Sequence, residues 1–134
     1  MKTQPKMWSI GHSNVQLEQF ISLLSTADIQ TIIDVRTKPR SRFWWFNGSA
    51  LAGSLEAIGV RYEHQPSIGG FARGDDYANV LDSLASRAES GERLAIMCSE
   101  GRPEQCHRGT ELAPELEARG VKVEHLLYGG ARNA

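Results

Sequence analysis

The stretch Thr31-Ile32-Ile33-Asp34-Val35 decides the class of fold. It is β-branched and mostly apolar, a composition that favours a strand buried on both faces. Leu94-Ala95-Ile96-Met97 predicts another short strand later in the chain. Strands covered on both faces occur almost only in parallel sheets that carry helices on each side. The sequence therefore predicts an α/β fold.

Short apolar runs alternate with helical patterns along the rest of the chain. The expected strands cover residues 7–10, 31–35, 60–62, 94–97 and 121–127. Apolar residues at helical spacing predict helices over 15–24, 51–58 and 77–88, and Pro103 suits the first turn of a helix that runs to about Arg119. This order predicts a single three-layer α/β domain over residues 1–134, with a mostly parallel sheet of about five strands and helices on both faces.

Composition and charge restrict the class of partner. The 134-residue chain has 15 Lys and Arg residues against 16 Asp and Glu residues, so its formal net charge is −1. This balance argues against a bulk electrostatic partner such as long duplex DNA, while a local basic patch stays open. The sequence has neither an apolar run that could cross a membrane nor the apolar core of a signal peptide. Two cysteines are too few for a disulfide framework, so we expect a cytoplasmic protein without a membrane partner.

Chemically distinctive residues follow three of the predicted strands. They are His12 and Ser13 after the first, Asp34 and Arg36 at the end of the second, and Cys98 and Glu100 after the fourth. In parallel sheets, ligands bind outside the carboxyl ends of the strands. We therefore expect these residues to share one pocket at that edge, together with His107 and Arg108.

The clearest motif is Cys98-Ser-Glu-Gly-Arg-Pro-Glu-Gln-Cys106-His107-Arg108, where a strand leads into a Gly/Pro loop that opens a helix. Backbone N–H groups and the positive end of the helix dipole would stabilise an anion there, either a bound phosphate or a thiolate. Arg102 and Arg108 add positive charge. Cys98 is therefore a candidate nucleophile or sulfur carrier, and Cys106 is a second candidate. The alternative is that Cys98 is a small buried apolar residue and that Cys106 packs one helix face.

The histidines and Asp34 have candidate roles beside the cysteines. His12 and His107 are candidates for moving protons, because imidazole titrates near neutral pH. Alternatively, His12 lies on the surface and Ser13 caps a helix. An unpaired carboxylate at the end of a buried strand is costly, so we expect Asp34 to be buried and paired with a cation. Asp34 would then orient a histidine or form a purely structural ion pair.

A metal site is a weaker alternative reading of the same residues. Cys98, Cys106, His107 and His12 could supply two thiolates and two imidazoles, but their spacing is not that of zinc modules. We therefore expect no metal and no other cofactor.

Residues 36–46 form a basic segment interleaved with aromatic residues. Cations there could bind phosphates while Trp44 or Trp45 stacks on a base, so the segment could hold a nucleotide or a single strand of nucleic acid. Alternatively, Trp44, Trp45 and Phe46 fold back as a lid or join the core. Further along, Gly69-Gly70 allows either the close approach of a ligand or a tight turn.

Several motifs together resemble one family. They are Ile10-Gly11-His12-Ser13, Asp34-Val35-Arg36, Pro39-x-Ser41, Tyr62, Gly69-Gly70 and Cys98-x-Glu100 followed by Cys106-His107-Arg108. In this order they resemble the domain of unknown function DUF488 over about residues 7–128, although Gly101-Arg102 lies where that family more often has an acidic or polar residue. The resemblance implies a fold and a site but no activity. The surroundings of Asp34 and Cys98 also resemble, more weakly, rhodanese-like domains, which carry sulfur on a loop cysteine.

Two functions are compatible with these observations. The first is a thiol-dependent transferase or hydrolase acting on a phosphate-bearing or nucleotide-like substrate, with Cys98 as nucleophile or sulfur carrier. Its other catalytic candidates are His12 and His107, which would move protons, and Asp34, which would orient one of them. Its candidates for binding a small anionic ligand are Ser13, Arg36, Ser41, Gly69, Gly70, Glu100, Arg102, Cys106 and Arg108. The second is a nucleotide- or nucleic-acid-binding module without turnover that uses the 36–46 segment.

Overall fold

The computed structural model describes residues 4–69 and 74–130. Within those residues the strands are β1 (Lys6–Gly11), β2 (Thr31–Asp34), β3 (Arg61–His64), β4 (Leu94–Cys98) and β5 (Lys122–Leu126). The α-helices there are α1 (Leu17–Thr26), α2 (Gly48–Glu56), α3 (Tyr77–Glu89) and α4 (Ala113–Glu117). Short helical turns are η1 (Trp44–Phe46), η2 (Pro66–Ile68), η3 (Pro103–Gln105), η4 (Arg108–Leu112) and η5 (Tyr128–Gly130). None of the helices in this part of the chain is both long and apolar enough to cross a membrane.

The strands form one sheet in the order β3-β2-β4-β1-β5, and every neighbouring pair is parallel. The two apolar stretches of the sequence, in β2 and β4, occupy the second and third positions of this sheet. β1 lies beside them, and all residues of β2 and β4 are buried. The predicted α/β fold with helices on both faces is confirmed, and the sheet is entirely parallel.

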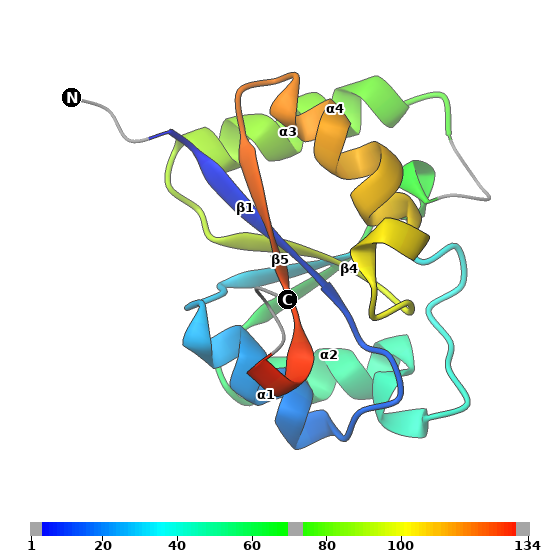
Figure 1. The fold of residues 1–134 in the computed structure, drawn as a ribbon. Helices are drawn as coiled ribbons and strands as arrows, with labels where there is room; N and C mark the ends of the chain where they lie inside the picture. Colours follow the sequence, from blue (N-terminus) through cyan, green and yellow to red (C-terminus); the bar gives the residue numbers. More distant parts are fainter. Residues whose placement is uncertain (1–3, 70–73, 131–134) are drawn as a thin grey trace.

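Alternate residues of β1, β2, β4 and β5 enter two separate apolar cores. Trp8 and Ile32 pack on one face with α1 and α2, whereas Met7 and Ile33 pack on the other face with α3 and α4. Figure 1 shows the two helix pairs on opposite sides of the sheet. This arrangement explains the continuous apolar composition of the strands, because neither face is left to solvent.

The connections create a crevice at the end of β4. The chain leaves β1 and β2 toward the face covered by α1 and α2, but it leaves β4 toward α4 on the opposite face. β4 lies between β2 and β1 in the sheet. Ligands in open α/β sheets bind where neighbouring connections diverge in this way. The fold therefore places a crevice on either side of the loop that begins at Cys98.

The predicted continuous helix from Pro103 to Arg119 is wrong at its beginning. η3 is followed by Cys106 in an extended conformation (φ −130°, ψ 143°), and the regular helical path begins only at His107. The first part of that path is the π-helical turn η4. The break has a tertiary cause. In its extended conformation Cys106 directs its sulfur toward Cys98, and the Arg108 side chain reaches back beneath the loop to Cys98 Sγ.

Candidate functional site

The ends of β1, β2 and β4 meet at the carboxyl edge of the sheet. The His12 backbone N–H donates to the Cys98 carbonyl oxygen at 2.9 Å. Asp34 is the register partner of Met97, which directly precedes Cys98. The expectation that Cys98, His12 and Asp34 lie together at this edge is therefore confirmed.

A close backbone crossing fixes the loop after β4 against the end of β1. A Cβ atom on Gly11 would lie 1.7 Å from the carbonyl oxygen of Glu100, so only glycine lets the two segments approach this closely. Ser13 follows in a left-handed conformation (φ 51°), and its N–H donates to the Ser99 carbonyl at 2.8 Å. The end of β1 thus positions the loop that carries Cys98.

Asp34 forms a buried bidentate ion pair with Arg36, as expected. Arg36 Nε donates to Asp34 Oδ1 at 2.9 Å, and Nη2 donates to Oδ2 at 2.8 Å. The Asp34 side chain is fully buried and that of Arg36 is 5% exposed. The Tyr62 hydroxyl also donates to Asp34 Oδ2, and burial together with this carboxylate raises the pKa of Tyr62, so the hydroxyl keeps its proton. The pair leaves Arg36 with little net charge to offer an anion.

His12 is a buried, neutral imidazole. Its Nδ1–H donates to the Ser13 carbonyl at 2.7 Å, and its ring stacks on Phe46 with the centroids 4.4 Å apart. The remaining nitrogen, Nε2, accepts from Arg36 Nη1 at 3.4 Å. Burial is the largest cause that lowers the pKa of His12 to about 4. The alternative of a surface histidine is wrong, because the residue is 4% exposed.

The lowered pKa of His12 predicts a loss of stability in weak acid. The unfolded chain binds a proton at this residue below about pH 6.5, whereas the folded protein does so only near pH 4. Between these values the free energy of unfolding falls as the pH falls, by about 3 kcal/mol from this residue in total. Urea unfolding of the wild type and of His12→Gln at pH 7 and pH 4.5 would measure the difference. An equal pH dependence in both proteins would contradict the assignment.

Arg108 lies fully buried beneath the loop after β4. Its Nη1 lies 2.9 Å from Cys98 Sγ and donates to the Glu100 carbonyl at 2.6 Å. Nη2 donates to the Gly101 carbonyl at 3.2 Å, and Nε donates to Ser9 Oγ at 3.1 Å. Burial lowers the pKa of Arg108 to about 10, so the guanidinium remains charged at neutral pH. Within the described residues, no carboxylate lies within ion-pair distance of it.

The two cysteines meet across the loop. Cys98 ends β4, Cys106 follows η3, and their Sγ atoms form a disulfide. Each residue is 8% exposed. The backbone N–H of Arg108 points to Cys106 Sγ at 3.5 Å, so a single residue contacts both sulfur atoms. Both residues also belong to the apolar core on the side of α3 and α4, so the alternative of buried packing residues holds for their surroundings, although Cys106 is extended rather than helical.

His107 connects the helix after the loop to η2. Its Nε2–H donates to the Ile68 carbonyl at 2.7 Å, which leaves Nδ1 facing the Glu111 carboxylate at 3.4 Å. The ring is partly exposed and lines the cleft beside the cysteines. Of the two candidate histidines, His107 is therefore the one that shares a cleft with both cysteines.

Two hollows flank the loop after β4. The larger one has a volume of about 770 Å³ and lies on the β2 side. The functional residues among its lining are Arg36, Thr37, Lys38, Cys98, Glu100, Cys106 and His107. The smaller one lies on the β1 side, and its lining includes His12, Ser13, Arg40, Ser41 and Arg42. The structure thus has two hollows where the sequence predicted a single pocket. Asp34 and Arg108 are buried and line neither of them.

The remaining candidates for anion binding serve mainly the loops. Ser41 Oγ accepts the Phe43 N–H at 3.0 Å, and the Glu100 carboxylate accepts the Arg102 N–H at 3.0 Å. The Arg102 guanidinium is directed to the Gln105 side chain at 2.8 Å. Gly69 packs against the β2 loop, since a Cβ there would lie 2.5 Å from the Val35 carbonyl oxygen. Gly70 lies outside the described residues.

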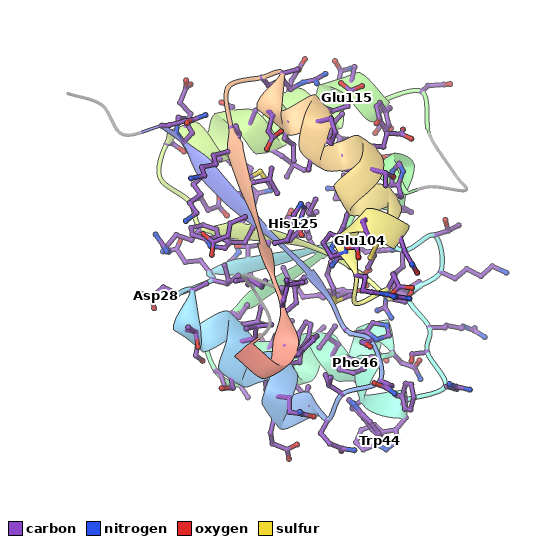
Figure 2. The ribbon with its side chains drawn as sticks, in the orientation of Figure 1. Asp28, Trp44, Phe46, Glu104, Glu115 and His125 are labelled. Atoms are coloured by element: carbon purple, nitrogen blue, oxygen red, sulfur yellow. A yellow bond between two sulfur atoms is a disulfide. The ribbon has the colours of Figure 1, made fainter. Side chains whose placement is uncertain are left out.

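The basic and aromatic 36–46 segment is divided between core and surface. Phe46 is fully buried, and Trp45 is half-buried with its Nε1–H donating to the Val15 carbonyl at 3.1 Å. Trp44 is 68% exposed, on the outer side of the segment (Figure 2). Lys38, Arg40 and Arg42 are exposed as well. The alternative that the aromatic residues join the core therefore holds for Phe46 and in part for Trp45, whereas Trp44 and the basic side chains lie at the surface.

Three contributors to the site were not expected from the sequence. Ser9 is fully buried, accepts from Arg108 and hydrogen-bonds to His125 Nδ1 of β5. The Thr37 hydroxyl oxygen is buried at the cleft and has no hydrogen-bond partner among the residues that the structure describes. Lys38 provides an exposed ammonium at the same cleft. Only one signal for these three residues was present in the sequence: they lie within or shortly after strands that lead to candidate site residues.

Fold and site together define a class: a three-layer α/β protein with a cysteine loop over a buried arginine, at the carboxyl edge of a parallel sheet. The family model of DUF488, described as a domain of unknown function, matches residues 16–79. This match confirms the expected resemblance to DUF488 over that segment, which holds Asp34, Arg36 and Ser41. His12 and the loop from Cys98 to Arg108 lie outside the matched residues. No curated protein and no solved structure gives a significant match.

Proposed function

We propose that this protein is an enzyme in which the reduced Cys98 thiolate attacks a small anionic substrate in the larger cleft. The reaction class is a thiol-dependent transferase or hydrolase acting on a phosphate-bearing or nucleotide-like molecule. The observation that carries the proposal is the contact of 2.9 Å between the buried Arg108 guanidinium and Cys98 Sγ.

The electrostatic reason lies in the missing counterion of Arg108. A buried charge is costly unless a partner of opposite charge accompanies it. No described carboxylate pairs with this guanidinium, and Cys98 Sγ is the one contacting atom that can become an anion once the disulfide is reduced. A neighbouring cation lowers the pKa of a cysteine thiol, and the thiolate is the nucleophilic form.

Substrate binding in the cleft would use groups that the fold leaves available. Lys38 provides an exposed ammonium, and the Thr37 hydroxyl, which has no partner among the described residues, would provide a donor and an acceptor. Arg36 lines the cleft but is neutralised by Asp34, so Lys38 would supply the main cationic contact to a phosphate. Lysine binds phosphate as a point charge.

Proton transfer is assigned to His107 rather than His12. His107 lines the cleft beside both cysteines, and its Nδ1 lies 3.4 Å from the Glu111 carboxylate. His12 is neutral, and its one acceptor nitrogen is directed to Arg36. Asp34 then acts structurally through Arg36. A thiolate of this kind persists in a reducing compartment, which favours the cytoplasm.

The test is alkylation of Cys98 in the Cys106→Ser variant, where it is the one remaining cysteine. We expect its iodoacetamide rate to follow an apparent pKa below the value of about 8.5 for a model thiol. Inorganic phosphate should slow the reaction by occupying the cleft, and chloride at equal ionic strength should not. Mass spectrometry against pH measures both effects. A rate that follows a pKa of about 8.5 or higher, unaffected by phosphate, would remove Cys98 as nucleophile.

The second candidate is a nucleotide- or nucleic-acid-binding module without turnover. The exposed Trp44 next to the exposed Arg40 and Arg42 is the observation that favours it, since bases stack on exposed aromatic rings while cations bind phosphates. The alkylation experiment separates the two candidates. An unreactive Cys98, combined with salt-sensitive binding of a short oligonucleotide that Trp44→Ala abolishes, would favour the module.

A further inference from the structure

The two cysteines form a pair whose members differ in environment. Both line the larger cleft, and both are 8% exposed. Cys98 Sγ faces the charged Nη1 of Arg108 at 2.9 Å, whereas Cys106 Sγ faces a neutral backbone N–H at 3.5 Å. A guanidinium stabilises a neighbouring thiolate much more than a single amide does. Cys98 is therefore the better thiolate of the two and also the better leaving group when the disulfide opens.

Two parts of the fold hold Cys98 and Cys106 close to each other. Cys98 is fixed at the end of a buried strand, and the extended backbone at Cys106 brings the second sulfur back over the loop. The Arg108 side chain ties the loop down through the carbonyl oxygens of Glu100 and Gly101. The Cys106 N–H also donates to the Pro103 carbonyl at 3.1 Å, and the Cys106 carbonyl accepts from the Gly109 N–H at 3.0 Å. These backbone bonds and the Arg108 contacts do not require the S–S bond, so we expect the two thiols to stay neighbours after reduction.

We propose that Cys98 and Cys106 form a working dithiol–disulfide couple that exchanges with a small-molecule disulfide in the larger cleft. This inference rests on the nucleophilic Cys98 of the proposed function and adds Cys106 as the resolving residue. A small partner is favoured because both sulfurs lie inside a cleft of about 770 Å³ and are nearly covered. A bulky protein disulfide could not reach them without opening the loop.

The exchange proceeds in two steps. The Cys98 thiolate attacks one sulfur of the small disulfide, whose S–S bond breaks as the mixed disulfide forms and one thiolate leaves. The Cys106 thiol then gives its proton to the departing thiolate and attacks Cys98 Sγ, which forms the Cys98–Cys106 bond and releases the second small thiol. The protein loses two electrons and the small disulfide gains them. A dithiol reductant reverses the sequence, with Cys98 as the sulfur first released.

The experiment uses the full-length protein, reduced with a dithiol, freed of reductant and mixed with glutathione disulfide. Free thiols are titrated over time, and peptides are mapped by mass spectrometry without reduction. We expect the wild type to lose both thiols and to yield the Cys98–Cys106 link, with little mixed disulfide. Cys106→Ser should stop at a glutathione adduct on Cys98. Cys98→Ser should form an adduct on Cys106 at least about threefold more slowly, because a thiol pKa lower by one unit gives about ten times more thiolate but a less nucleophilic one.

Each contrary result is distinct. A mixed disulfide that persists on Cys98 of the wild type would overturn the resolving role of Cys106, while rapid alkylation of Cys98 would keep the proposed function. Equal rates of adduct formation in Cys98→Ser and Cys106→Ser would overturn the assigned order of attack. A Cys98 thiol that resists both glutathione disulfide and iodoacetamide would remove the proposed function as well.

Discussion

Replacement of Asp34 by alanine is expected to lower the free energy of unfolding by about 3–5 kcal/mol, the cost of leaving a buried charge without its partner. The Asp34 carboxylate is fully buried, and it accepts from Arg36 Nε and Nη2 and from the Tyr62 hydroxyl. In Asp34→Ala the Arg36 guanidinium remains under the sheet edge without a counterion. Urea unfolding at pH 7 measures the effect.

A surface ion pair of the same length provides the matched control. Arg119 Nε donates to Asp82 Oδ1 at 2.7 Å, but the Asp82 side chain is 65% exposed. Water and salt screen such a pair, so Asp82→Ala should cost less than about 1 kcal/mol. If Asp34→Ala lowered the free energy of unfolding no more than Asp82→Ala does, the buried ion pair would not stabilise this edge of the sheet.

Replacement of Arg108 by methionine is expected to slow alkylation of Cys98 at neutral pH by about threefold or more, because each unit of rise in the thiol pKa lowers the thiolate fraction up to about tenfold while it raises the nucleophilicity of the thiolate only about threefold. Methionine fills much of the buried volume of arginine but has no charge to stabilise the thiolate. The measurement is the pH profile of the iodoacetamide rate in the Cys106→Ser background. The midpoint of the profile should move to higher pH.

The same profile separates the charge of Arg108 from its structural role. Arg108 also holds the Glu100 and Gly101 carbonyl oxygens, so its loss loosens the loop and changes the exposure of Cys98. Exposure alters the limiting rate at high pH, where every thiol is ionised, whereas charge alters the midpoint. Arg102→Met is the control, since this exposed arginine of the same loop contacts Gln105 instead of a sulfur. A midpoint unchanged in Arg108→Met would contradict the proposed thiolate.

Much of the fold could be predicted because it depends on local pattern. The apolar runs of β2 and β4 indicate strands covered on both faces, and the structure buries every residue of both. The position of Cys98, His12 and Asp34 at one edge follows from the polarity of parallel strands. The burial of Asp34 beside a cation follows from the cost of an unpaired carboxylate inside a sheet.

The segment from Pro103 to Arg108 could not be predicted in the same way. Local preferences there favour a helix that starts at Pro103. The chain instead extends at Cys106, because contacts with Cys98 and with the carbonyls over Arg108 outweigh the hydrogen bonds of one more helical turn. Such contacts join residues that the sequence pattern treats as independent.

The sequence by itself determined the parallel α/β architecture, the sheet edge at which the candidate site residues lie, and the need of Asp34 for a cation. These features depend on strand polarity and on the cost of burying a charge, and both can be judged from each residue and its neighbours in the sequence. Only the tertiary structure decided which side chain each arginine contacts. It paired Arg36 with Asp34 and placed Arg108 under Cys98. The physical reason is that an arginine side chain is long enough to reach many different groups. The packing of the strands and of the loop between Cys98 and Arg108 determines which of these groups each arginine contacts.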